Sequence, residues 1–269
     1  MDQLNRNQAP FSADVWERID AAAVKAARDR LTARRFLDVE GPYGPGLTTI
    51  EVGNDDYCRQ PGPGEAGAVV ARAVSVPMLR KSFGLSIRRV AAHVDNGLPL
   101  NLAPVEEAAE AVAAREEEIV YYGQADFGLA GLLTTEKRSR HTAGDWSDLD
   151  QVLNDVLAAV TKLDAVGARG PYALVLEPAL YNSLFRRYPG TELLQLEHLR
   201  RLCSEGIHKA SIQGGALVDS HAGVLVIGHD LMAGYAGQDG IHLQLYLSES
   251  LVLRLDQPEG VCTLEFNKT

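Results

Sequence analysis

Hydrophobic positions along the chain predict three amphipathic helices, with strand-like segments between and after them. The first helix is expected to begin at the N-cap Ser12, because Val15, Ile19, Ala22 and Ala26 then fall on one face. This face is rich in alanine, so it suits close packing against another backbone or an added peptide. Arginines near the end of the segment complement the negative end of the helix dipole.

The second helix is expected to be a long spine. It begins near Pro104, which suits the first helical turn, and ends at Gly123, which suits the residue after the C-cap. The third helix follows Ser147 and Asp150, whose spacing resembles a capping box, and it ends at Gly167. One further helix is predicted by the leucines Leu193, Leu196, Leu199 and Leu202.

Residues 50–77 predict a long hairpin that protrudes from the rest of the chain. Alternating residues at both ends are typical of strands, whereas the run Gln60–Glu65 contains two prolines and two glycines, which exclude a helix or a central strand. A two-stranded ribbon is only marginally stable alone in water. We therefore expect a neighbouring copy of the chain to complete it.

The remaining segments are mainly β. Leu79–Val90 is rich in strand-forming residues, and Gly170–Leu176 predicts a turn that enters a buried strand. The turn signal Asn96-Gly97 separates the first of these segments from the spine. The chain is expected to close with strands at Ala216–Val218, Val224–Ile227, Ile241–Leu247, Leu251–Leu255 and Val261–Phe266.

Composition narrows the classes of protein that fit this pattern. The 269 residues carry a net charge of −10, which argues against a surface that coats nucleic acid. No stretch approaches the roughly 20 apolar residues of a membrane span, and Met1–Pro10 lacks the apolar run of a secretory signal peptide. Three cysteines without a CxxC pair favour a reducing cytoplasm, with no disulfide and no zinc site.

Candidate catalytic and metal-binding groups form no constellation that predicts an enzyme. The seven histidines lack metal-binding spacings, so neither a metal nor another cofactor is expected. Asp219, Ser220 and His221 are triad residue types, but a triad requires convergence in space rather than adjacency. Cys203 lies near the end of an apolar stripe, which predicts a buried structural thiol. The acidic run Glu116–Glu118 is expected to be a solvated helix face.

The stretch Arg34–Gly44 links the first helix to the hairpin and has the sequence RRFLDVEGPYG. It resembles the signature of encapsulins, bacterial and archaeal proteins that assemble into icosahedral nanocompartments and are also described as linocin- or bacteriocin-like. The similarity extends over essentially the whole chain. It is carried further by Leu4, Arg6, Ala9-Pro10, Trp16, Ile19-Asp20, Gly123, Gly131-Leu132-Leu133, Gly170-Pro171-Tyr172, Gly228–Leu231 and Gly234-Tyr235.

The resemblance implies an α+β fold of the tailed-bacteriophage major-capsid type. Its parts would be an N-terminal arm and helix with the start of the P-domain (1–49), an E-loop (50–77), the P-domain with the spine helix (78–130), an A-domain (131–225) and closing strands of the P-domain (226–269).

The family's cargo enzymes carry a short C-terminal targeting peptide with apolar and basic residues. By resemblance, this peptide docks on the inner wall of the shell, between the first helix and the P-domain. The matching positions are Leu31, Arg34, Phe36 and Asp38, with Met232, Ala233 and Tyr235 opposite. Leu31 and Phe36 would offer pockets, and Asp38 would pair with a basic peptide residue. An ion pair between Arg34 and Asp38 that holds the helix end is the alternative, and both can be true.

Two further features are implied by the family. Its five-fold pore is lined by a polar loop that matches Arg186, Arg187, Tyr188, Pro189, Gly190, Thr191 and Glu192, whose side chains would select the solutes that pass. Some members bind flavin beside an aromatic residue that follows the hairpin. This chain has Ile87-Arg88-Arg89 in that neighbourhood, so no flavin is expected.

The sequence therefore predicts a non-enzymatic, cytoplasmic shell subunit. By the resemblance, its cargo would be a dye-decolourising peroxidase or a ferritin-like iron oxidase. The compartment would then act in the response to oxidative stress or in iron storage. Its partners would be copies of itself and the cargo, without a membrane or nucleic acid. A prophage major capsid protein that packages DNA is the alternative, because overall acidity does not describe the inner wall alone. A hydrolase is a third class, suggested only by older protease assignments in the family.

Overall fold

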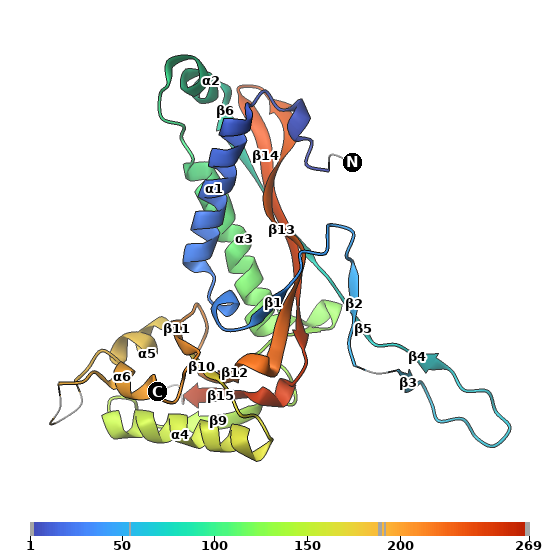
Figure 1. Cartoon of the computed structure of the whole chain (residues 1–269), viewed down its shortest axis with the longest axis vertical. Coiled ribbons are helices and arrows are strands. Elements are labelled where there is room, and N and C mark those ends of the chain that lie inside the picture. Colours follow the sequence, from blue (N-terminus) through green and yellow to red (C-terminus); the bar gives the residue numbers. More distant parts are fainter. Residues whose placement is uncertain (1–2, 54, 188–189, 191, 267–269) are drawn as a thin grey trace.

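The computed structural model describes residues 3–53, 55–187, 190 and 192–266. Its first lobe is built on a four-stranded sheet with two long helices along one face (Figure 1). In sheet order, the strands are β1 (Asp38–Glu40), β13 (Gly223–Asp239), β14 (His242–Leu255) and β6 (Met78–Ser86), and the helices are α1 (Ala13–Arg30) and α3 (Ala103–Tyr122). β1 runs parallel to β13, and the other pairs are antiparallel.

The predicted apolar face of α1 is correct at its start and shifts by one residue further on. Ser12 is the N-cap, and Val15 and Ile19 are buried. In the last two turns Ala23 and Ala27 are buried, at 1% and 4% exposure, in place of the predicted Ala22 and Ala26. Ala22 and Ala26 are half-buried and pack against the same core, so the most buried stripe lies one residue beyond the predicted one.

Two predicted strand boundaries are wrong in the first lobe. Leu79–Val90 is not strand throughout, because the chain enters helix α2 (Ile87–Asn96), which buries Val90 and exposes its arginines. The strands predicted at Ile241–Leu247 and Leu251–Leu255 are one strand, β14. The polar residues between them suggested a break, yet they are buried and paired with β6 and β13.

The second lobe is a five-stranded sheet with α4 packed against it (Figure 1). In sheet order, its strands are β11 (Gly206–Lys209), β10 (Tyr172–Leu176), β12 (Gly215–Asp219), β15 (Val261–Phe266) and β9 (Ser139–Ala143), and its helices are α4 (Leu149–Ala165), α5 (Pro178–Ser183) and α6 (Gln195–Leu199). The segment 226–269 thus contributes β14 to the first sheet and β15 to the second.

The N-terminus of α4 and the length of the leucine helix differ from the prediction, whereas Gly167 follows the C-cap Val166 of α4 as predicted. The N-cap of α4 is Asp148, whose carboxylate accepts a hydrogen bond from the Asp150 N–H at 3.0 Å, so the capping box at Ser147 is not formed. The predicted leucine helix is reduced to α6.

In the described part of the chain, no helix combines the length and apolarity needed to cross a bilayer.

The predicted hairpin is a narrow ribbon that extends away from both lobes (Figure 1). It consists of two short antiparallel pairs, β2 (Thr49–Glu51) with β5 (Ala73–Ser75) and β3 (Asp56–Tyr57) with β4 (Val69–Val70). Val69 and Val70 are each 51% exposed. A further short pair, β7 (Gly123–Gln124) with β8 (Leu129–Ala130), follows α3.

Candidate functional site

The segment Leu31–Arg35 after α1, called the junction below, is bound by two consecutive glutamates of α3. The Glu117 carboxylate accepts hydrogen bonds from the N–H groups of Thr32 and Ala33, at 2.9 and 3.0 Å, and from the Thr32 hydroxyl. It thereby satisfies the free N–H groups at the start of the 3₁₀ turn Ala33–Arg35. Burial raises the pKa of Glu117, and these hydrogen bonds oppose the shift.

Glu116 binds the side chain of Arg34. Its two oxygens accept from Nε and Nη2 of Arg34 at 2.6 and 2.8 Å, a bidentate pair. The guanidinium also contacts Glu249 Oε2 on β14 at 3.1 Å and Asp230 Oδ1 on β13 at 3.3 Å. Arg34 therefore ties the junction to three elements of the first lobe.

These contacts overturn two expectations from the sequence. The acidic run on α3 is not a solvated face, because Glu116 and Glu117 are 0% and 7% exposed and only Glu118 is at the surface. The alternative ion pair between Arg34 and Asp38 is also wrong. Asp38 lies exposed on β1, and the Arg34 guanidinium is bound by other carboxylates.

A groove of about 640 Å³ lies beside the Arg34 cluster. One wall is α1 and the junction, and the other is formed by the middle of β13 and β14. Its apolar lining comes from Val24, Ala27, Leu31 and Leu231, and its charged lining from Arg28, Asp29, Arg34, Arg35, Asp230 and Glu249. Two of the seven predicted docking residues, Leu31 and Arg34, are thus brought together in one concave site.

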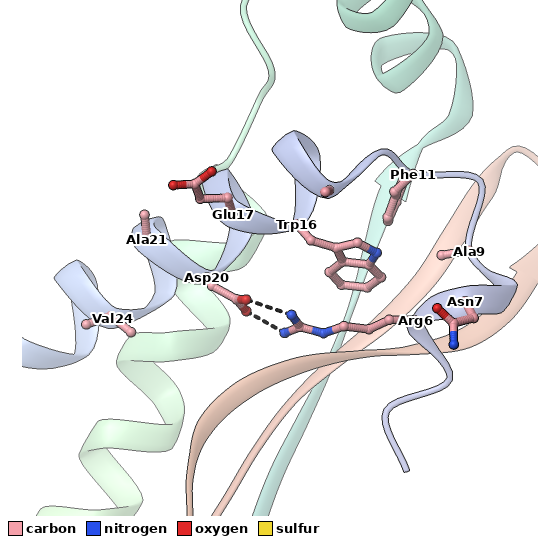
Figure 2. Close-up of a pocket in the computed structure, with 10 residues that line it drawn as sticks. Arg6, Asn7, Ala9, Phe11, Trp16, Glu17, Asp20, Ala21 and Val24 are labelled. Atoms are coloured by element: carbon pink, nitrogen blue, oxygen red, sulfur yellow. Dashed lines mark hydrogen bonds and ion pairs between the residues drawn. The ribbon is translucent and has the colours of Figure 1, made fainter. Parts of the chain in front are cut away.

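A second hollow, of about 880 Å³, lies along the same helix toward its N-terminus, where the N-terminal arm crosses β13 (Figure 2). Arg6 of the arm donates to both Asp20 oxygens at 2.6 and 2.8 Å and to the Ala233 carbonyl at 2.9 Å. Its guanidinium lies 4.7 Å from the centre of the Trp16 ring. Val24 lines both hollows, which places them end to end along α1.

The other predicted docking residues lie outside the groove lining. Ala233 and Tyr235 bind the arm through their backbones, and the Tyr235 N–H donates to the Leu4 carbonyl at 2.8 Å. Phe36 is buried against His208 of the second lobe, with ring centres 5.4 Å apart. Met232 is half-buried on β13.

Sequence reasoning missed Leu231, Asp230 and Glu249 as groove residues. The first two belong to the Gly228–Leu231 motif and could have been found there. Glu249 interrupts an otherwise apolar strand between two serines, and an acidic residue in that position is itself a signal of a buried polar contact.

The predicted pore loop is described in part. Tyr188, Pro189 and Thr191 lie outside the described residues. Arg187 forms an exposed ion pair with Glu192 at 3.3 Å, and Gly190 is exposed between them. Arg186 instead donates to the carbonyls of Ser183 and Ser147, both at 2.9 Å, and of Trp146. Its guanidinium therefore fastens the base of the loop.

The remaining candidates have structural roles. The buried Asp219 carboxylate accepts from the N–H groups of Arg169, Gly170 and His221, which fixes this turn, and its Oδ1 lies 3.0 Å from Nδ1 of the exposed His221 ring. Cys203 is buried as predicted, and burial raises the pKa of its thiol to about 12. Within the described residues, no three His, Cys, Asp or Glu side chains are placed to hold a metal ion.

Comparisons with known proteins agree with this architecture. A family model described as "Encapsulating protein for peroxidase" matches residues 1–252. The type 1 encapsulin shell protein EncA of Myxococcus xanthus is 30% identical over 280 residues, which cover 98% of this chain and 96% of that protein. The match to EncA thus spans nearly the whole length of both proteins.

Solved structures show the same fold. The virus-like particle from Pyrococcus furiosus has a TM-score of 0.75 at 21% identity, covering 94% of this chain and 100% of that chain. The capsid of Myoviridae phage XM1 has a TM-score of 0.61 at 17% identity, covering 86% and 90%. The predicted fold of the tailed-bacteriophage major-capsid type is confirmed.

Proposed function

The chain belongs to the encapsulin family of shell proteins, and from that premise we propose that it is a structural subunit of a nanocompartment that encloses a cargo protein. The cargo docks through a C-terminal peptide in the groove beside Arg34. The observation that carries this proposal is the groove itself, a concave and partly apolar site formed by α1, the junction, β13 and β14. The family, described as encapsulating proteins for peroxidase, supports a peroxidase as cargo, with a ferritin-like iron oxidase as the other candidate.

The groove is suited to a short extended peptide. Ala27 and Val24 have small side chains, so the α1 wall leaves room for a peptide backbone, while Leu31 and Leu231 offer apolar contact. The Arg34 contacts to three elements fix both walls before binding, which lowers the entropy lost on docking. A multimeric cargo that engages several grooves gains avidity even when each contact is weak.

The other predicted residues receive supporting roles in this proposal. Ala233 and Tyr235, which follow Met232 on β13, bind the N-terminal arm, and the arm lines the neighbouring hollow along α1. Phe36 joins the junction to the second lobe through His208. Asp38 is the exposed carboxylate on β1, available to a basic peptide residue that extends beyond the groove.

A loading assay tests the docking site. A fluorescent protein with a C-terminal peptide of leucine, glycine and lysine is co-expressed with the shell, and its fluorescence in purified particles is measured. Val24→Trp fills the lip shared by both hollows and is expected to lower loading about tenfold or more. Val166→Trp is the control, because Val166 is exposed to a similar degree, 50% against 41%, and lies in the second lobe. Equal loading of the two variants would contradict docking in this groove.

A capsid that packages DNA is the second candidate, because the fold is shared with phage capsids. The nucleic-acid content of purified particles separates the two functions. We expect particles whose ultraviolet absorbance is that of protein alone. An absorbance ratio typical of nucleic acid that survives nuclease treatment of intact particles would favour the capsid.

We also propose that the described part of the loop 186–192 faces a pore in the assembly. Its exposed pair Arg187 and Glu192 would present both signs of charge to passing solutes.

The parts of the chain then correspond to those of capsid proteins. The N-terminal arm and α1 correspond to the N-arm, the ribbon to the E-loop, the first lobe to the P-domain and the second lobe to the A-domain.

A further inference from the structure

The Arg34 guanidinium lies among three carboxyl groups. Glu116 of α3 binds it through both oxygens, Asp230 of β13 contacts it at the surface, and Glu249 of β14 contacts it through Oε2 alone. One guanidinium cannot neutralise three carboxylates. Glu249 is therefore the buried carboxyl group whose charge would be least compensated if it ionised in the empty groove.

Glu249 is also incompletely hydrogen-bonded. Its side chain is 2% exposed, and Oε2 contacts Arg34 Nη2 at 3.1 Å. No N–H or O–H group of the described residues donates to the buried Oε1. The neighbouring Glu116 carboxyl group lies within hydrogen-bond reach of the Glu249 side chain, which is possible only when one of the two holds a proton. A buried carboxyl oxygen without a partner costs free energy, and such groups in native structures need an explanation. Because Glu249 lines the groove, a ligand in the groove can provide the missing partner.

We propose that Glu249 is the receptor for a basic side chain of the docked peptide, and that this side chain displaces a proton from Glu249 on binding. The inference rests on the proposed docking function and names the chemistry that the groove selects. A lysine or arginine of the peptide would bring a further cation to the groove and donate to Oε1. The peptide cation stays protonated, the O–H bond of Glu249 breaks, and the proton passes to the buffer.

The electrostatics of the empty groove agree with this exchange. Burial and the neighbouring Glu116 raise the pKa of Glu249, and Arg34 opposes the shift only in part. Glu249 in the free groove therefore retains a proton to a higher pH than an ordinary carboxyl group does, and a cationic ligand makes that proton unfavourable. Since binding releases a proton, a rise in pH strengthens binding of a basic peptide until Glu249 is already ionised in the free groove.

The test uses purified shells and two labelled peptides of leucine and glycine, one ending in lysine amide and one in norleucine amide. We expect the lysine peptide to bind about tenfold more tightly. Its advantage is expected to grow as the pH is raised from about 6 to about 8, and calorimetry in buffers of different ionisation enthalpy is expected to show proton release for this peptide alone. This comparison needs no variant, so it does not depend on how a variant folds.

Variants then assign the effect to Glu249. Glu249→Gln keeps the size of the side chain but can neither ionise nor release a proton, so the preference for lysine and its pH dependence are expected to disappear. Asp230→Asn is the matched control, because Asp230 contacts the same guanidinium but is 61% exposed, and proton release is expected to remain. Proton release that is lost in Asp230→Asn and kept in Glu249→Gln would assign the receptor to Asp230 and overturn the inference.

The failures of the inference and of the docking function differ. If both peptides bind equally without proton release, and Val24→Trp abolishes binding of both, the groove is the docking site and the role of Glu249 is wrong. If neither peptide binds the wild-type shell at any pH, docking in the groove fails and the inference fails with it.

Discussion

At the scale of single residues, the two arginines that follow α1 have different environments. Arg34 is bound by Glu116, Glu249 and Asp230 inside the first lobe. Arg35 is exposed and donates to the Arg28 carbonyl at 3.1 Å, at the end of α1. Removing one partner of a buried ion pair costs more folding free energy than replacing both partners with apolar residues, because the remaining partner is left charged and desolvated. The two positions are therefore expected to respond differently to substitution.

The three glutamates of the acidic run provide a matched series. Glu116→Gln is expected to lower the free energy of unfolding by about 3 kcal/mol, because it leaves the Arg34 guanidinium without its bidentate carboxylate. Glu117→Gln is expected to cost about 1–3 kcal/mol, because an amide presents a donor where Thr32 and Ala33 already donate. Glu118→Gln is the exposed control and is expected within about 0.5 kcal/mol of the wild type.

Guanidinium unfolding monitored by circular dichroism measures these differences. If all three variants had the same denaturant midpoint of unfolding, Glu116 and Glu117 would contribute no more to stability than the exposed Glu118. The sequence could not distinguish the three positions, because the partners that bury Glu116 and Glu117 lie 82 to 85 residues away along the chain. The sequence shows Arg34 and Arg35, but it does not show which face of α3 contacts Arg34.

A second buried carboxylate predicts how the stability of the second lobe varies with pH. Burial alone would raise the pKa of Asp155, but hydrogen bonds from His141, Gly144, Trp146 and Gln151 outweigh it and hold the pKa below its usual value. The folded state therefore binds a proton here less readily than the unfolded state. The stabilisation is present above the unfolded pKa of about 4 and is lost as the pH falls through the lower folded value.

Asp155→Asn is expected to remove this acid-side dependence. At pH 7 the variant is destabilised by about 1–3 kcal/mol, because the amide cannot accept from four donors. Near pH 3 its difference from the wild type is expected to shrink, since Asp155 is then partly protonated in the wild type as well. Thermal unfolding of both proteins across this range provides the measurement. Glu136→Gln, at an exposed position on the same lobe, is the control, and a constant difference at all pH values would contradict the assignment.

At the scale of elements, the ribbon has too few contacts of its own to explain its conformation. Its two pairs comprise three and two residues per strand, and the Val69 and Val70 side chains are half-exposed. Isolated pairs of this length are marginal in water. We therefore expect partner copies in the assembly to provide the contacts that the single chain lacks.

Deletion of residues 54–65 tests this dependence. The subunit is expected to keep its helical and sheet content, because neither lobe contains these residues, while the yield of closed particles falls at least about tenfold. Circular dichroism measures the first quantity and size-exclusion chromatography the second. Normal particles from the deletion variant would show that the ribbon is dispensable for assembly.

Element boundaries were predictable where the local pattern is strong and were missed where tertiary pairing overrides it. The spine α3 and the ribbon follow directly from Pro104, Gly123 and the Pro/Gly-rich run. β14 appeared as two strands, because Ser248, Glu249 and Ser250 are polar. They are buried at 2–4% exposure only because β6 and β13 flank them and Arg34 faces the strand. Glu249, the middle residue of the three, lines the groove, so the break in the predicted strand and the failure to identify Glu249 have one cause.

At the scale of the whole molecule, several large apolar side chains remain exposed around the first lobe. Tyr43 and Met78, 62% and 57% exposed, lie at the base of the ribbon. Phe127 is 71% exposed beside the end of α3, and Ile241 is 66% exposed at the tip of the β13–β14 hairpin. Exposed apolar groups at several edges of one molecule are typical of a subunit that contacts several neighbours.

These exposed groups, together with the ribbon and the family to which the chain belongs, predict that the purified protein is a closed particle of megadalton mass. Burial of apolar side chains and completion of the ribbon stabilise the assembled state, and a symmetric closed shell leaves none of these edges free. Electron microscopy and mass photometry at near-neutral pH measure the outcome. The double variant Tyr43→Ser/Met78→Ser is expected to shift the population toward small species, whereas Val166→Ser, an exposed apolar position that caps α4, leaves the particle unchanged. A discrete monomer or dimer of the wild type, with its ribbon folded onto its own lobes, would contradict the shell.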